Sequence, residues 1–498
     1  MTATAERVAA VMDRYEAVIG IEIHCQLKTA SKMFCGCSTA YDGAAPNTHV
    51  CPVCLGLPGT LPVINRRAVE FVIATGLAIE GHIPERTQWE RKNYFYPDLP
   101  KGYQISQYAI PLAARGRLSI ETSAGPFVVN ITRAHLEEDT AKLVHGDAVG
   151  SDGRRTTLVD FNRSGAPLME IVTEPEIRTA EQARRYAEEL QLLMRAIGAS
   201  DADMERGQMR VEANVSLRPR GTEPFGTRVE VKNMNSFRAV ERAIAYEIER
   251  QATALDAGDP LSMETRGWDD GRQATYRMRA KETSDDYRYF PEPDLPPLHV
   301  EPAWIAAVRA GVPELPAARR ARYEGLGLSH YDASVLVADP GMTAAFEAIA
   351  AAGPGLPAKE VANFVSGPHA QAAKAGGLND TGTAGASTPA GIAALLGAIV
   401  DGRVARPAGR ELLARHLAEG IPADELLATA GPGPISDDGA LLGHVDAVIA
   451  ANPGAVADYR AGKPVTRFFV GQVMKATGGA ADAARVSQLV RERLDAGA

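Results

Sequence analysis

The hydrophobic and polar positions of the first 300 residues follow strand periodicity in some segments and helix periodicity in others. Asn65 caps an apolar stripe with helical spacing, and Thr179 and Gln182 form a capping-box pattern before a second stripe. Residues 1–14, before this pattern begins, are predicted to be a loosely held leader that has little to pack against the rest of the chain. Strands are predicted over residues 15–27, 168–172, 205–217 and 227–237.

The pattern changes near residue 300. The proline run from Pro291 to Pro297 predicts extended polyproline and a domain boundary. Beyond it the chain is alanine-rich, and residues 375–388 have the Gly, Ala and Thr content of a linker. Helical patterns recur at 302–310, 314–325, 329–337 and 341–352, with short amphipathic helices from about 389. We predict an α+β multidomain protein with domains at 15–300, 301–405 and 406–498.

Composition and charge describe an ordinary globular protein. The 498 residues are 45% hydrophobic and 23% charged, and no apolar run reaches the length of a membrane span. The N-terminus lacks a signal-peptide pattern, so we expect a cytoplasmic protein with no membrane association. The net charge of −9 argues against a general nucleic-acid coat but allows a local basic patch.

All five cysteines fall within thirty residues, and four of them have metal-ligand spacing. Cys35 and Cys37 form a C-x-C pair, and Cys51 and Cys54 form a C-x-x-C pair. This spacing suits a closed, structural Zn²⁺ site, with Cys25 left over in a strand. The alternatives are free or redox-active thiols, or His49 as a substitute ligand.

Carboxylates inside apolar strands are the strongest chemical signal. Glu170 interrupts the run LMEIV, and Glu22 and His24 share one face of the strand VIGIEIH. An isolated glutamate of this kind often faces solvent. Two such strands, together with the pair Glu137 and Glu138, instead predict a hard-cation site, most naturally for Mg²⁺.

The segment 91–105 is predicted to be a loop rich in aromatic and cationic residues, because it contains two prolines and a glycine. Its lysines, Lys92 and Lys101, suit phosphates, and tyrosines such as Tyr94 suit a base or an RNA end. A rigid surface loop is the alternative. Near the C-terminus, Arg460, Lys463, Arg467 and Lys475 surround Phe468 and Phe469, a pattern that predicts RNA contact unless it is a solvated helical face.

Residue chemistry alone predicts metal-dependent phosphoryl chemistry on a nucleic acid or small polar substrate. Several long motifs carry a more specific resemblance: VIGIEIHCQLKT, RKNYFYPDLPKGYQISQY, HLEEDTAK, DFNRSGAPLMEIV, DDYRYFPEPDLPPL and FFVGQVMKATGGAAD. From about residue 15 to the C-terminus, the chain resembles the B-subunit family of the bacterial aspartyl/glutamyl-tRNA amidotransferases, the GatCAB complex. The resemblance is dense to residue 300 and weaker from 300 to 460.

The resemblance implies a fold and a function. The family fold is a mixed α/β cradle, a helical domain and a small helical tail that touches tRNA. Its members bind Glu-tRNA(Gln) or Asp-tRNA(Asn), phosphorylate the amino-acid carboxylate with ATP and Mg²⁺, and amidate it with ammonia channelled from the amidase (A) subunit. The implied protein is a carbon–nitrogen ligase subunit that uses glutamine as amido donor. A small C subunit completes the heterotrimer.

The resemblance also suggests site residues. His24, Glu138 and Glu170 would hold Mg²⁺, Glu22 and Glu137 would complete the acidic shell, and Glu212 would lie near the same metals. Lys92, Tyr94 and Lys101 would border ATP and the tRNA acceptor end. Glu138, Glu170 and Lys92 are the predicted catalytic residues. The zinc cysteines occur in only some family members.

Two competing functions remain at this point. A non-catalytic tRNA-binding scaffold would tolerate neutralisation of Glu138 and Glu170 but not deletion of the tail. A zinc-dependent hydrolase would need an open metal position, which four cysteine ligands do not leave. The partly apolar settings of Glu22 and Glu170 favour a bound cation over the scaffold.

Overall fold

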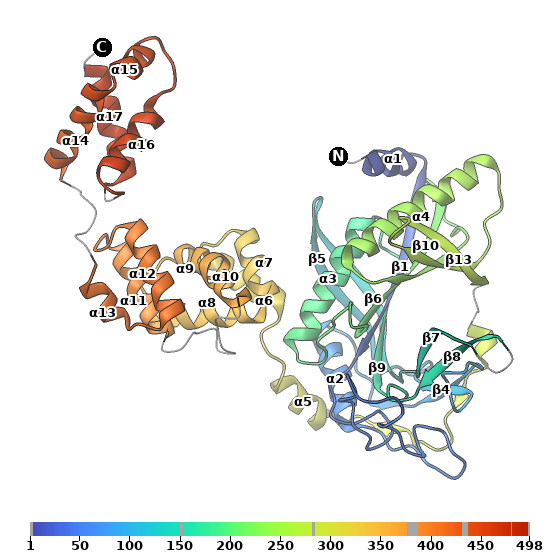
Figure 1. The fold of residues 1–498 in the computed structure, drawn as a ribbon. Helices are drawn as coiled ribbons and strands as arrows, with labels where there is room; N and C mark the ends of the chain where they lie inside the picture. The colour runs from blue at the N-terminus through green and yellow to red at the C-terminus, as the bar shows by residue number, and fades with distance from the viewer. Residues whose placement is uncertain are drawn as a thin grey trace. The chain divides into compact units, whose positions relative to one another are not determined.

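The computed structural model describes residues 3–149, 153–280, 284–375, 387–430, 437–479 and 481–496. The chain forms two compact units, Met1–Pro316 and Ala317–Ala498 (Figure 1). The predicted linker at 375–388 lies largely outside the described residues.

The first unit is built on an eight-stranded sheet with the order β13-β12-β11-β10-β1-β9-β6-β5. The central strand β1 pairs antiparallel with β10 on one side and with β9 on the other. Among the described strands of this sheet, β11 and β12 are the one parallel pair. The strands are β1 (Tyr15–Gln26), β5 (Ala113–Thr122), β6 (Gly125–Glu138), β9 (Pro167–Thr173), β10 (Met209–Pro219), β11 (Val229–Met234), β12 (Glu264–Asp269) and β13 (Ala274–Ala280).

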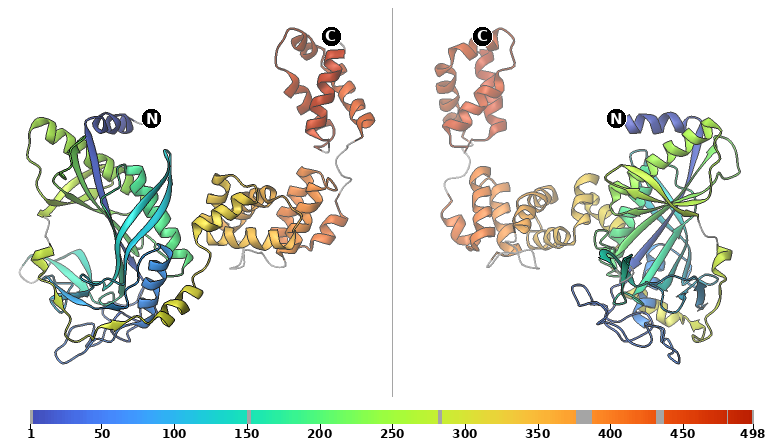
Figure 2. Two further views of the ribbon diagram at one scale, coloured as in Figure 1. Left: turned by 180° about the vertical axis from the view of Figure 1, so that it is seen from behind. Right: turned by 45° about the vertical axis from the view of Figure 1, so that its right-hand side comes forward.

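Three helices cover one face of this sheet: α2 (Arg66–Ala78), α3 (Ala180–Ala196) and α4 (Phe237–Ala257) (Figure 2). Their apolar stripes bury Ile19, Ile21 and Ile23 of β1, which are fully inaccessible to solvent. The predicted caps are confirmed: Asn65 accepts from the backbone at the start of α2, and Thr179 forms a capping box with Gln182. The opposite face of the sheet is therefore available for the polar residues that alternate with the isoleucines.

Smaller elements surround that opposite face. They are β2 (Arg86–Thr87), β3 (Glu90–Asn93), β4 (Tyr103–Ser106), β7 (Lys142–Val149), β8 (Arg155–Asp160), η1 (Ser284–Tyr287), β14 (Phe290–Pro291) and β15 (Leu298–His299). The prediction of an irregular loop over 91–105 was wrong at both ends, because β3 pairs with β4 and with the distant β14. Tertiary pairing overrides the local breakers, and the prolines lie in the intervening turn. Lys92 therefore lies on a strand.

The prediction of a loosely held leader was wrong for residues 3–12. They form α1 (Ala3–Met12), which contacts α4. Val11 is buried in the core of the unit, and Arg7 forms an ion pair with Glu249 at 2.8 Å. The prediction failed because the partner of this short apolar stripe lies more than two hundred residues away.

The remaining described elements are helical, and the predicted α+β multidomain class is confirmed. They are α5 (Pro302–Ala310), α6 (Pro316–Gly325), α7 (His330–Ala338), α8 (Pro340–Ala352), α9 (Ala358–Phe364), η2 (Val365–His369), α10 (Ala370–Lys374), α11 (Pro389–Val400), α12 (Arg406–Glu419), α13 (Ala423–Ala428), α14 (Asp438–Ala451), α15 (Pro453–Arg460), α16 (Thr466–Ala476) and α17 (Ala483–Ala496). One apolar cluster joins α6 to α13 and another joins α14 to α17.

Among the described helices, none is by itself long and apolar enough to cross a bilayer. Two sharply bent helix pairs, α7 with α8 and α14 with α15, reach that length and composition only together.

Candidate functional site

Polar side chains line the open face of the sheet across five adjacent strands, β11, β10, β1, β9 and β6. In the antiparallel register, Glu22 lies opposite Glu212, and His24 lies opposite Glu170. Glu170 in turn lies opposite His135. The strand pairing thus gathers residues that are far apart in the sequence into one row.

This row is the floor of a cavity of about 550 Å³. Six carboxylates line it: Glu22, Glu137, Asp139, Glu170, Glu212 and Glu230. Five cationic side chains line it as well: Lys92, Arg133, Arg210, Arg228 and Lys232. The cations balance most of the carboxylates, so added divalent ions would leave the cavity positive, which favours a polyanionic ligand.

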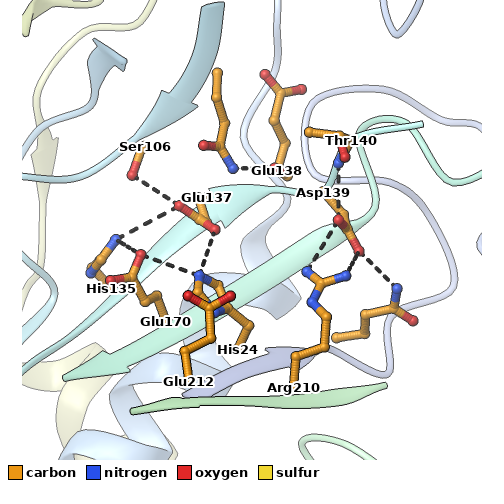
Figure 3. Close-up of polar contacts among 12 residues, drawn as sticks. His24, Ser106, His135, Glu137, Glu138, Asp139, Thr140, Glu170, Arg210 and Glu212 are labelled. Atoms are coloured by element: carbon orange, nitrogen blue, oxygen red, sulfur yellow. Dashed lines mark hydrogen bonds and ion pairs between the residues drawn. The ribbon is translucent and has the colours of Figure 1, made fainter. Parts of the chain in front are cut away.

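The first candidate metal group consists of His24, Glu137 and Glu170 (Figure 3). His24 Nε2 lies 3.5 Å from Glu137 Oε1 and 3.4 Å from Glu170 Oε2. The three residues offer ligand atoms that all lie within 4.8 Å of one another, a spacing that one ion can bridge. All three were predicted from strand alternation and resemblance.

The electrostatics of this group favour a cation at its centre. Burial alone would lower the pKa of His24, but the hydrogen bond to Glu170 and the surrounding carboxylates raise it to about 9. Burial opposes ionisation of Glu170, yet His135, His24 and Lys92 hold its pKa well below the usual value. Without a metal, the proton on His24 supplies the positive charge, and a bound metal ion would displace that proton.

His135 is a second histidine beside this group and was not predicted. Its Nε2 lies 3.4 Å from Glu170 Oε2, and burial lowers its pKa to about 3. Among the described residues, the Nδ1 atoms of both His24 and His135 lack a hydrogen-bond partner. The sequence could have indicated His135, because it lies two positions before Glu137 and the two residues therefore share one face of β6.

The second candidate metal group consists of Glu22, Glu212 and Glu230, which come from three neighbouring strands. Lys232 Nζ lies 2.7 Å from Glu212 Oε2 and 3.8 Å from Glu230 Oε2, so an ammonium already neutralises part of this charge. Thr265 donates a hydrogen bond to Glu230 at 2.6 Å. Glu230 was not among the predicted ligands, and only the pairing of β11 with β10 brings it close to Glu212.

Glu138 does not join either group. Successive side chains of a strand point to opposite sides, and Figure 3 shows Glu138 turned away from Glu137. Its Oε1 lies 2.5 Å from Lys101 Nζ and accepts the backbone N–H of Ile105 at 3.0 Å. The structure therefore pairs two predicted site residues with each other, beside a separate cavity of about 120 Å³.

Lys92 and Tyr94 do line the main cavity. The Lys92 ammonium lies 5.0 Å from the ring centre of Tyr287 and 5.9 Å from that of Tyr94. Burial would lower the pKa of Lys92, but Glu137 and Glu170 raise it well above its usual value. Tyr108 and Tyr289 stack at 4.5 Å on the same wall. A charged lysine among aromatic rings is suited to phosphate and base recognition.

Asp139 holds Arg210, another of the cationic side chains that line the main cavity. It accepts hydrogen bonds from Nη1 and Nη2 of Arg210, both at 3.2 Å, and from Gln26 at 2.8 Å. Burial opposes ionisation of Asp139, but Arg210 and Arg163 lower its pKa to about 2. In the sequence Arg210 is one polar position of an alternating strand, which fits either the floor of a ligand cleft or a solvated face, and the register with β1 places it beside His24.

The four predicted cysteines form a compact sulfur cluster, while Cys25 is buried apart from them in β1. The sulfur atoms of Cys35, Cys37, Cys51 and Cys54 lie within 4.8 Å of one another, and four thiolates are the ligand set of a closed structural zinc site. The hydrogen bond from Cys35 lowers the pKa of Cys54. This cluster can hold a metal ion. His49 is not part of the cluster. Its backbone N–H donates a hydrogen bond to Oδ1 of Asn162.

The basic tail residues lie on α15, α16 and the turn between them. Phe469 is buried in the core of these helices, whereas Phe468 is exposed. Lys463 pairs with Asp458 at 2.8 Å. RNA contact at this surface stays a prediction.

The fold and the cavity define a class: an α+β protein with a charged cavity, two metal-ligand groups on one sheet face and a cysteine-pinned loop. Two family models match, the GatB/GatE catalytic domain over residues 17–306 and the GatB domain over residues 344–494. The B subunit of the aspartyl/glutamyl-tRNA(Asn/Gln) amidotransferase from Moorella thermoacetica is 49% identical over 482 residues, 96% of this chain and 100% of that protein. Its counterpart from Gloeothece citriformis is 46% identical over 494 residues, 98% of this chain and 99% of that protein.

The chain belongs to the B-subunit family of the aspartyl/glutamyl-tRNA(Asn/Gln) amidotransferases. Members of this family are components of the tRNA-dependent amidotransferase, a ligase complex. The resemblance predicted from the sequence motifs is confirmed.

Proposed function

We propose that this chain activates and amidates the side-chain carboxylate of Glu-tRNA(Gln) or Asp-tRNA(Asn). The carboxylate oxygen attacks the γ-phosphorus of ATP, and the bond to the ADP oxygen breaks. Ammonia then attacks the acyl phosphate, phosphate leaves and the nitrogen loses a proton. The observation that carries this proposal is the pair of metal-ligand groups inside one cation-lined, aromatic cavity.

The residues present fit Mg²⁺. His24, Glu137 and Glu170 would hold one ion, and Glu22, Glu212 and Glu230 a second. Bound Mg²⁺ would supply positive charge to the phosphate oxygens. Carboxylate oxygens dominate both sets, as this hard cation prefers, and His24 is the one imidazole within the first set.

The cavity cations would position the phosphates. Lys92 and Arg133 flank the first metal-ligand group, and Asp139 holds Arg210 in a fixed orientation beside it. Tyr94 would border the nucleotide or the terminal base of the tRNA. Because Lys101 is paired with Glu138 beside the smaller cavity, we assign these two residues to a structural role rather than to metal binding.

Ammonia would reach the cavity from an amidase subunit, with a small C subunit completing the heterotrimer. Glu-tRNA(Gln) and Asp-tRNA(Asn) would be the RNA partners, and the tail helices would contact the tRNA body. The cytoplasm, where charged tRNAs reside, would be the site of action. The scaffold alternative assigns all chemistry to the partner, but it gives no reason for the two partly buried ligand groups.

Lys92→Met is expected to lower tRNA-dependent phosphate release by about 10²-fold, because a preorganised charge near the transferring phosphoryl group is lost. The measurement is the initial rate with the assembled complex, Mg-ATP and Glu-tRNA(Gln). Lys28→Met is the matched control, since Lys28 pairs with Asp201 at an exposed site. Equal rates for both variants would remove Lys92 from the proposed machinery.

We also propose that the cysteine cluster holds structural Zn²⁺. Cys54→Ser is expected to reduce bound zinc from about one ion per chain to nearly none. Zinc is measured by elemental analysis after dialysis against apo buffer. Cys25→Ala, which changes the cysteine outside the cluster, should retain zinc. Full zinc content in the Cys54 variant would contradict the assignment.

A further inference from the structure

Lys32 is a buried lysine beside the cysteine cluster, away from the main cavity. Its side chain is 1% exposed. Its Nζ donates to the carbonyl oxygen of His49 at 2.8 Å, and lies 3.4 Å from that of Phe161 and 3.6 Å from Cys54 Sγ. In the part of the chain that the structure describes, Lys32 forms no ion pair with a carboxylate. Burying an ammonium without a counter-charge is strongly unfavourable.

Cys54 is the neighbour of Lys32 that can carry negative charge. It is the one buried member of the cluster, and its Sγ also accepts the backbone N–H of Cys51 at 3.1 Å. Four thiolates around one Zn²⁺ leave two negative charges on the cluster. Donors aimed at a metal-bound sulfur disperse that charge and hold the ligand in place.

We propose that Lys32 is the counter-charge of the metal-bound Cys54 thiolate, so that the lysine and the zinc stabilise each other. This inference rests on the zinc assignment above and is independent of the phosphoryl chemistry. Lys32 is thus a positioning residue rather than a catalytic one.

Further hydrogen bonds connect the cysteine cluster to the wall of the main cavity. Asn162 accepts the backbone N–H of His49 at 2.7 Å, and Ser164 Oγ lies 3.3 Å from the carbonyl of Cys54. Gly165, in the same turn, donates to the carbonyl of Asp139 at 2.9 Å. Zinc bound by the cluster would therefore brace the segment directly after β6, which carries Glu137 and Glu138.

The test compares Lys32→Met with wild type in the full chain. Methionine has a similar length and no charge, so packing is largely retained. We expect Lys32→Met to release zinc to a chelator at least about tenfold faster than wild type. Lys28→Met, which removes an exposed lysine, should release zinc at the wild-type rate.

A second measurement uses the size of the stability change. With zinc bound, Lys32→Met should melt at a lower temperature than wild type. After zinc is stripped, this difference should shrink, because the four-thiolate cluster that Lys32 faces is then no longer held together by the metal. Equal release rates and the same melting shift in both states would overturn the inference while leaving the zinc site intact. A wild-type chain that retains no zinc would instead overturn the zinc assignment itself.

Discussion

Glu170→Gln is expected to lower tRNA-dependent phosphate release from Mg-ATP by about 10³-fold. Glu170 Oε2 lies 3.4 Å from both His24 Nε2 and His135 Nε2, at the centre of the first metal-ligand group. Glutamine keeps the shape of the side chain but removes its negative charge. A divalent ion then loses an anionic ligand, and His24 loses the partner that raises its pKa.

The matched control for this prediction is Glu174→Gln. Glu174 lies one residue beyond β9, accepts a hydrogen bond from Thr132 at 2.7 Å and is not part of the cavity wall. The phosphate-release rate of Glu174→Gln should stay within about twofold of wild type, as is usual for substitutions away from a functional group. If both variants slow equally, the loss reflects damage to the strand rather than to a metal-ligand group.

Glu137→Gln is expected to weaken Mn²⁺ binding by about 10²-fold, whereas Glu138→Gln leaves it unchanged. The two residues are adjacent on β6 and differ in the side of the strand they face. Glu137 lies 3.5 Å from His24 Nε2, while Glu138 pairs with Lys101. Mn²⁺ can be followed directly as the free-ion electron paramagnetic resonance signal during titration of the chain.

Glu138→Gln should still have a measurable effect on stability. It leaves the Lys101 ammonium without its carboxylate, a change that costs about 3 kcal/mol in a buried pair. A lowered melting temperature with normal Mn²⁺ affinity is therefore the expected combination. Equal loss of Mn²⁺ affinity in both variants would return Glu138 to the metal-ligand group predicted from the sequence.

Much of the site followed from strand periodicity alone. A glutamate or histidine at every second position of an apolar strand must share a face, and this places Glu22 beside His24 and marks Glu170 as buried. The cysteine cluster followed from spacing, because C-x-C and C-x-x-C pairs bring sulfur atoms together locally.

The rest of the site could not be predicted from periodicity, because it depends on which strands are neighbours and in which register they pair. Glu230 becomes a candidate ligand only because β11 lies next to β10, and Arg210 lines the cavity only because its position is opposite His24. Both the residue pattern and the resemblance to the family grouped Glu138 with the metal ligands, whereas alternation along β6 allows only one of two adjacent residues to face them. Long-range pairing also explains why Lys92 lies on a strand and why α1 packs as a helix.

The most direct test of the central claim replaces glutamine with ammonium, so that the amidase subunit is not needed for chemistry. The complex is assembled with wild-type, Glu170→Gln or Glu174→Gln chains, and phosphate release, Gln-tRNA formation and Glu-tRNA(Gln) binding are measured together. If the activation step lies in this chain, Glu170→Gln binds the tRNA normally but forms neither phosphate nor Gln-tRNA, while Glu174→Gln matches wild type. Normal turnover by Glu170→Gln would contradict the account and favour a tRNA-binding scaffold.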